Sequence, residues 1–156
     1  DDTYVLDRFY ILLMVTTLLM LRRQQLSRQV QILYWLRCRN SNKKFWHLLK
    51  LLRTQTVFDA IGGNVTVSFQ AKVSATTNLD NIKCAIVAWS GTADTVTSDI
   101  ISAWGVEGTN PTLIANATYE NSPANLNVTT SFATYSVTAN VDTASTSNII
   151  LLFGQM

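Results

Sequence analysis

The chain has 156 residues and a formal net charge of +2, which suits one domain with a modest core and points to no particular partner. The charge is unevenly distributed: residues 1–12 carry −2, residues 13–57 carry +9 and residues 58–156 carry −5. The two cysteines, Cys38 and Cys84, are too few for a disulfide scaffold and have no zinc-site spacing, so we expect neither.

The first segment, DDTYVLDRFYIL (residues 1–12), is a short polar lead into an apolar run. We predict that it supplies the first strand of a β domain.

The second segment, residues 13–57, is rich in the strong helix formers Leu, Arg, Gln and Lys. A break is expected at residues 40–42. Apolar residues recur at helical spacing on either side of it: Leu26, Val30, Leu33 and Leu36, then Phe45, Leu48, Leu49 and Leu52. The pattern predicts two amphipathic helices in an atypical basic segment.

Several interpretations of this basic segment exist. The apolar run at residues 9–21 would form a helix about 20 Å long, short of the roughly 30 Å hydrocarbon core, so no membrane span is expected. Its nine Lys and Arg residues match no nucleic-acid motif, although the aromatic residues Tyr34, Trp35, Phe45 and Trp46 could stack on bases. An interfacial helix and a helical hairpin packed on a sheet remain alternatives.

A further hypothesis is that residues 13–57 are read out of frame. They contain no Asp, Glu, Gly, Ala or Pro, whereas Gly and Pro alone average about 12% of residues in proteins. Accurate sequencing of the underlying DNA tests this hypothesis, and an intact frame in independent clones would exclude it.

The third segment, residues 58–156, predicts strands. NVTVSFQAKV (64–73) alternates with period two, KCAIVAWS (83–90) is apolar on both faces, SFATYSVTANV (131–141) alternates again, and NIILLF (148–153) is apolar throughout. Loops rich in turn residues separate these runs: SGTAD, EGTNP and ENSPAN. The fold class expected is mainly β, an antiparallel jelly-roll β-sandwich over about 58–156 preceded by the helical segment at about 13–57.

Three stretches carry a family resemblance: SFQAKV, AWSGTADTVTSDIISAWG and NPTLIANATYENSPA. With the opening DDTYVLDRFYIL, they resemble carbohydrate-binding-like jelly-roll domains of tail-fibre and other virion proteins of tailed bacteriophages. The resemblance covers residues 1–12 and about 58–153 and departs in the basic segment. The resemblance implies a receptor-binding or structural module in a virion tail. Because jelly rolls host many functions, the fold alone does not imply sugar binding.

Candidate ligand-binding residues lie in the loops. Trp104 and Tyr119 could contact a sugar, with the Trp104 indole stacked on a sugar face, while carboxylates could accept hydrogen bonds from sugar hydroxyls: Asp94, Asp99, Glu107 and Glu120. The alternative for Trp104, Tyr119 and Glu120 is a half-buried structural role. Asp94 and Asp99 could also hold a structural calcium ion, but no DxDxD spacing supports that. We therefore expect no cofactor and no metal.

No catalytic constellation stands out, because the only histidine, His47, lies in the basic segment and no carboxylates form a recognisable pair. We expect a non-enzymatic module that contacts a cell-surface glycan or other virion proteins, in a fibre that could be homotrimeric. No nucleic-acid partner is expected. The expected location is the virion tail. A carbohydrate-binding module of a secreted hydrolase and a purely structural spacer are the alternatives.

Overall fold

The computed structural model describes residues 8–21, 24–37, 46–52, 61–77, 79–93, 95, 100–106, 108–142 and 145–155, with side chains from residue 61 onward. These residues form strands and loops without a helix. The strands are β1 (Arg8–Leu21), β2 (Gln24–Arg37), β3 (Trp46–Leu52), β4 (Asn64–Val73), β5 (Ile82–Trp89), β6 (Ile101–Ala103), β7 (Thr112–Leu113), β8 (Ala117–Tyr119), β9 (Ala133–Asn140) and β10 (Asn148–Gln155).

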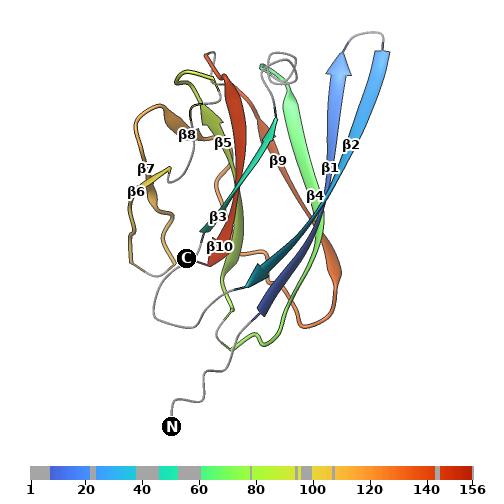
Figure 1. Cartoon of the computed structure of the whole chain (residues 1–156), viewed down its shortest axis with the longest axis vertical. Helices are drawn as coiled ribbons and strands as arrows, with labels where there is room; N and C mark the ends of the chain where they lie inside the picture. Colours follow the sequence, from blue (N-terminus) through green and yellow to red (C-terminus); the bar gives the residue numbers. More distant parts are fainter. Residues whose placement is uncertain are drawn as a thin grey trace.

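The strands form two four-stranded sheets and one small hairpin (Figure 1). One sheet has the order β2-β1-β4-β9 and the other has the order β3-β10-β5-β8. The pair β6-β7 makes the third, two-stranded sheet. All pairings are antiparallel. The chain is therefore mainly β with antiparallel sheets over the described residues.

Strands β4 and β9 have the alternation that the sequence predicts. Every second residue of β4 is buried: Val65, Val67, Phe69, Ala71 and Val73. The two strands pair in an unbroken register from Asn64↔Asn140 to Ala71↔Ala133. Because successive side chains point to opposite faces, the other face carries Thr, Ser, Asn and Gln. The β4-β9 pair therefore presents one apolar and one mostly polar face.

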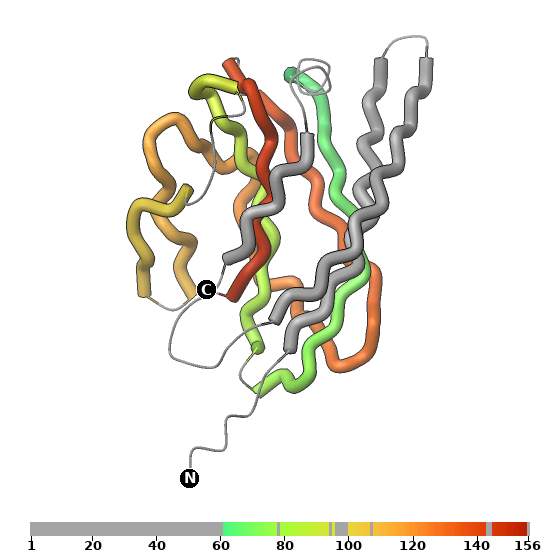
Figure 2. The backbone as a smooth tube through the Cα atoms, in the orientation of Figure 1, coloured from blue at the N-terminus to red at the C-terminus, as the bar shows by residue number. Residues whose placement is uncertain are grey.

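The two large sheets enclose a common core. From β4 come Val65, Val67 and Phe69, and from β5 and β10 come Ile82, Cys84, Ile86, Ile149, Leu151 and Phe153. Phe69 and Phe153 meet edge to face, with ring centroids 4.9 Å apart. Figure 2 shows β4 and β9 in one layer and β5 and β10 in the other. The core therefore draws on both sheets.

Strands β5 and β10 are buried on both faces, as the unbroken apolar runs predict. Their second face carries a separate cluster of Ala85, Val87, Ile100, Ile150 and Leu152. Leu113 of β7, Ile114 after it and Ala117 at the start of β8 pack against this cluster. The β6-β7 hairpin belongs to this outer layer (Figure 1).

The prediction of helices at residues 13–57 is wrong wherever the structure describes them. β1 pairs with β2 along its whole length and with β4 through six residue pairs, and β3 pairs with β10. The residues of β2 allow both readings, since Leu26, Val30, Ile32, Tyr34 and Leu36 also alternate with period two. Helix propensities differ by only tenths of a kcal/mol per residue, so pairing to a formed sheet outweighs them.

No helix in the described ranges is long and apolar enough to cross a bilayer.

Candidate functional site

The candidate site is the loop of the β6-β7 hairpin, described at residues 104–106 and 108–111, which we call the Trp104 loop. The hairpin is closed by the pairs Ile101↔Leu113 and Ala103↔Thr112. The hydroxyl of Ser102 lies 3.2 Å from the carbonyl oxygen of Thr112 and 3.0 Å from that of Leu113, and donates toward them. The two ends of the Trp104 loop are thus held together by backbone and side-chain bonds.

A tight turn shapes the tip of the Trp104 loop. The Thr109 amide donates to the Val106 carbonyl oxygen at 3.1 Å, and the Thr109 hydroxyl donates to the same oxygen at 2.6 Å. Gly108, the third residue of this turn, has φ 85°. A positive φ at that position is typical of a type II turn and favours glycine. The turn therefore follows from local sequence.

Gly105 makes the loop compact. A Cβ atom added at this position would collide with the side-chain hydroxyl of Thr109. Glycine is therefore needed where the two sides of the Trp104 loop approach each other.

The Trp104 loop exposes two large apolar side chains. Trp104 is 44% exposed and Val106 is 75% exposed. Partly buried tryptophan side chains on rigid supports are frequent contact residues at binding sites, because they offer a large area at little entropic cost. Of the three sequence-predicted candidates that the structure describes, Trp104, Tyr119 and Glu120, Trp104 is the one whose exposed side chain suits ligand contact.

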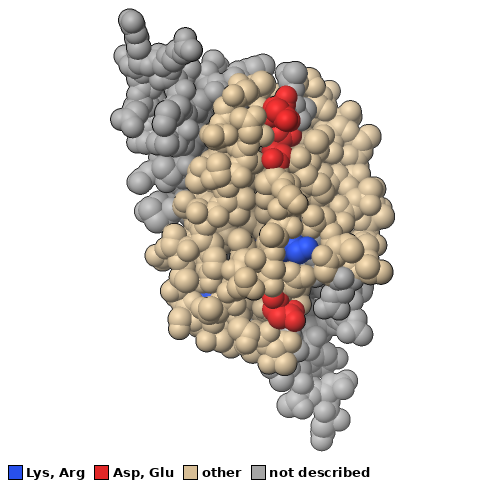
Figure 3. Space-filling view, turned by 180° about the vertical axis from the view of Figure 1, so that it is seen from behind, with Lys and Arg blue, Asp and Glu red and all other residues tan. Residues whose placement is uncertain are grey.

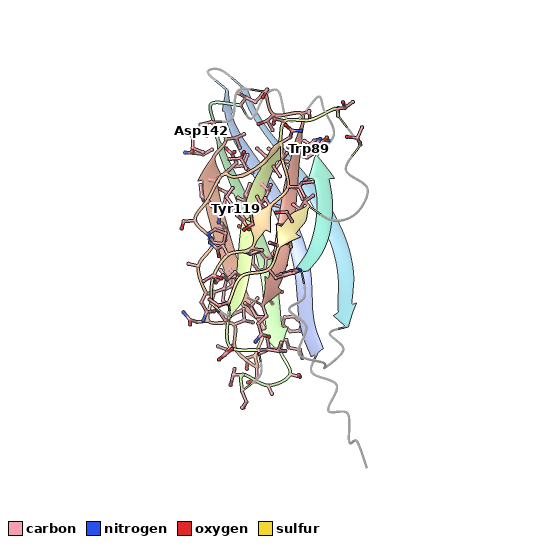
Figure 4. The ribbon with its side chains drawn as sticks, turned by 90° about the vertical axis from the view of Figure 1, so that its left-hand side faces the viewer. Trp89, Tyr119 and Asp142 are labelled. Atoms are coloured by element: carbon pink, nitrogen blue, oxygen red, sulfur yellow. The ribbon has the colours of Figure 1, made fainter. Side chains whose placement is uncertain are left out.

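Tyr119 instead supports the base of this loop. It is partly buried against the outer cluster, and its hydroxyl donates to the Pro111 carbonyl oxygen at 2.9 Å. Burial raises the pKa of Tyr119 to about 12. Figure 4 places Tyr119 near the middle of this face, with Trp89 toward one end. The structure therefore gives Tyr119 a contact that fixes the start of β7.

The Glu120 carboxylate is hydrogen-bonded outside the Trp104 loop. Its Oε2 accepts a hydrogen bond of 2.9 Å from the backbone amide of Asp142, and so links the end of β8 to the segment after β9. Asp94, Asp99 and Glu107 lie outside the described residues, so the calcium and carboxylate predictions made on them stay predictions.

Trp89 packs against the outer cluster, and its indole Nε1 donates to the Thr92 carbonyl oxygen at 3.0 Å. Trp89 therefore has a packing role at the end of β5.

Sequence reasoning missed two supporting residues. The side-chain amide of Asn121 accepts from the Ile86 amide at 2.7 Å and donates to the Cys84 carbonyl oxygen at 3.1 Å, which continues the ladder of β5 beyond β8. Lys83 is buried, and its ammonium donates to Gly108 and Asn110 of the Trp104 loop. The only sequence signal for Lys83 is a lysine beside an otherwise apolar run.

The described surface carries little charge. From residue 61 onward the described charged residues are Lys72, Asp80, Lys83, Glu120 and Asp142. Most of the described surface seen in Figure 3 is uncharged. No group of three or more His, Cys, Asp or Glu side chains in the described ranges is placed to hold a metal ion. Such a surface offers neutral hydrogen-bonding groups around the Trp104 loop.

Comparison with protein-family models, with curated proteins and with solved structures finds no match for this chain.

Proposed function

We propose that this chain is a non-enzymatic recognition module with a jelly-roll β-sandwich fold, and that its Trp104 loop contacts neutral glycans on a cell surface. By its sequence resemblance, the module belongs to a virion tail or fibre of a tailed bacteriophage. A homotrimeric fibre would present three loops together, which raises overall affinity without any new contact.

The strand order supports the jelly-roll proposal. Successive strands change sheet at β2-β3, β3-β4, β4-β5, β8-β9 and β9-β10. Strand exchange of this kind between two packed sheets is typical of double Greek-key folds. The small hairpin β6-β7 would then be an insertion that carries the recognition loop.

The observation that carries the functional proposal is the exposed indole of Trp104 on a loop closed by hydrogen bonds. An indole face can stack on the C–H face of a sugar ring, and a preformed loop pays less entropy on binding. The nearby Ser102, Thr109 and Asn110 are polar and exposed. Binding of an uncharged sugar to these groups would not require desolvation of an ion.

A second candidate is a structural contact with another virion protein. The 75% exposure of Val106 favours it, because an aliphatic side chain beside an indole suits an apolar protein surface as well as a sugar. A third candidate is a carbohydrate-binding module of a secreted hydrolase. Neighbouring genes distinguish it: the first two candidates predict capsid and tail genes nearby, and the third predicts a catalytic domain in the same reading frame.

The experiment is a binding assay of the labelled protein on a broad glycan array and on candidate host cells. We expect binding to a subset of neutral glycans, with little dependence on salt, because the sugar itself carries no charge to be screened. Binding that disappears at high salt would contradict the neutral-sugar mechanism. Absence of binding on both surfaces would favour the structural role.

A further inference from the structure

Lys83 occupies an unusual place for a lysine. It lies near the start of β5, on the face that also carries Ala85 and Val87, and it is only 6% exposed. Lysine side chains are rarely this buried without a specific partner. Burial holds the pKa of Lys83 below its usual range. A reason for keeping an ammonium here has to come from its contacts.

Those contacts lead to the Trp104 loop. The Lys83 ammonium donates to the Gly108 carbonyl oxygen at 2.9 Å and to Asn110 Oδ1 at 3.1 Å. Gly108 is the residue with positive φ in the turn, and Asn110 precedes the return into β7. The two bonds join the loop to the central strand across 25 and 27 positions of the sequence.

Stability alone does not account for this arrangement. Burial of an ammonium costs free energy, and an apolar side chain of similar length often gives an equally or more stable protein. The two acceptors belong to exposed residues, so water could satisfy them if the lysine were absent. What only the ammonium supplies is a directional link between β5 and both sides of the loop tip.

We propose that Lys83 is a positioning residue that holds the Trp104 loop in its binding conformation. This inference rests on the proposed function for its effect on ligand affinity, but its effect on the loop does not. Lys83 acts through Gly108 and Asn110 and need not touch the ligand. Removal of the ammonium should free the loop while the two large sheets stay intact.

The first test is Lys83→Met, which keeps the length and apolar stem of the side chain and removes its donors. Hydrogen exchange followed by NMR should show faster exchange at the Thr109 amide, by about tenfold or more, with the amides of Val87 and Ile150 unchanged. Lys72→Met is the matched control, because Lys72 lies over the Phe132 ring on the other sheet. Unchanged exchange in the loop, or a uniform increase over β5 and β10, would overturn the proposal.

A second variant, Asn110→Ala, tests the same link if Lys83→Met does not fold. Asn110→Ala removes one acceptor at an exposed position and should also speed exchange at Thr109, by less than Lys83→Met does. The double variant should exchange no faster than Lys83→Met alone, because both changes remove the same link. Fully additive effects would mean that the two residues act independently and would overturn it.

The binding readout uses a glycan selected on the array. Lys83→Met should weaken its binding mainly through faster dissociation, since the contacting side chains remain. If the loop loosens and affinity is unchanged, the positional role in recognition is wrong although the anchoring contact is real. If no glycan binds the unaltered protein, the proposed function fails and the exchange result still decides the anchoring.

Discussion

Trp104→Ala should weaken glycan binding by about thirtyfold or more, the loss expected when an aromatic contact at the centre of a small site is removed. Its thermal stability should change little, because the 44% exposed indole lies on a loop outside both core clusters. Isothermal titration with an array-selected glycan and thermal unfolding of the same sample measure the two effects separately.

The matched control for this substitution is Trp89→Phe. Trp89 packs against the outer cluster rather than standing on the Trp104 loop, so its replacement should leave affinity within about twofold of the original, within the scatter expected of sites that do not interact. Equal losses from both substitutions would indicate a general effect of tryptophan removal on the fold. Undiminished binding by Trp104→Ala would show that ligand contact lies elsewhere on the molecule.

Phe69→Ala should be the most destabilising of the substitutions considered, by about 3–5 kcal/mol. Phe69 is 1% exposed at the centre of the core between the sheets. Its ring meets Phe153 edge to face and lies 6.0 Å from the Tyr135 ring, so truncation removes contacts on β4, β9 and β10 together. Urea unfolding followed by circular dichroism gives the free energy of unfolding.

Phe132→Ala provides the comparison for Phe69, because the same side chain at 53% exposure should cost less than about 1 kcal/mol. A loss at Phe69 as small as that at Phe132 would mean that the two large sheets do not share a packed core. That outcome would remove the scaffold on which the Trp104 loop is argued to depend.

Four strands after residue 61, β4, β5, β9 and β10, could be predicted from the sequence because their periodicity reflects their burial. The short strands β6, β7 and β8 could not, since two or three residues are too few to show a period. β4 alternates, since one face meets the core and the other meets solvent, while β5 and β10 are apolar throughout because both of their faces are covered. Alternation with period two predicts a strand buried on one face, and an unbroken apolar run predicts a strand buried on both faces.

The sequence of the basic segment predicts helices, although the structure has strands there, because its residues fit two periodicities. Leu26, Val30, Leu33 and Leu36 have helical spacing, but the even positions of Gln24–Arg37 are also mostly apolar. Leu, Arg and Gln favour the helix locally. The choice was made by partners far away in sequence, β4 for β1 and β10 for β3, which a local pattern does not reveal.

Some features of the candidate site could be predicted from the sequence and others could not. The exposure of Trp104 could be expected from Gly and Asn-rich sequence around it, because turn residues place their neighbours at the surface. The roles of Lys83 and Asn121 could not be predicted from the sequence, since their hydrogen-bond partners lie 25 to 37 positions away. Tyr119 was chosen as a ligand contact, whereas its hydroxyl is bonded to Pro111.

The most direct test of ligand recognition by the Trp104 loop is an NMR titration of the labelled protein with an array-selected glycan. The largest chemical-shift changes should fall on residues 104–110 and on the indole N–H of Trp104, with small changes on β4 and β9. The alternative binding surface on the same molecule is the polar outer face of β4 and β9, where the hydroxyls of Thr66 and Thr138 are hydrogen-bonded at 2.9 Å. If the largest changes fall on that face and the resonances of the Trp104 loop do not shift, recognition by the Trp104 loop is contradicted.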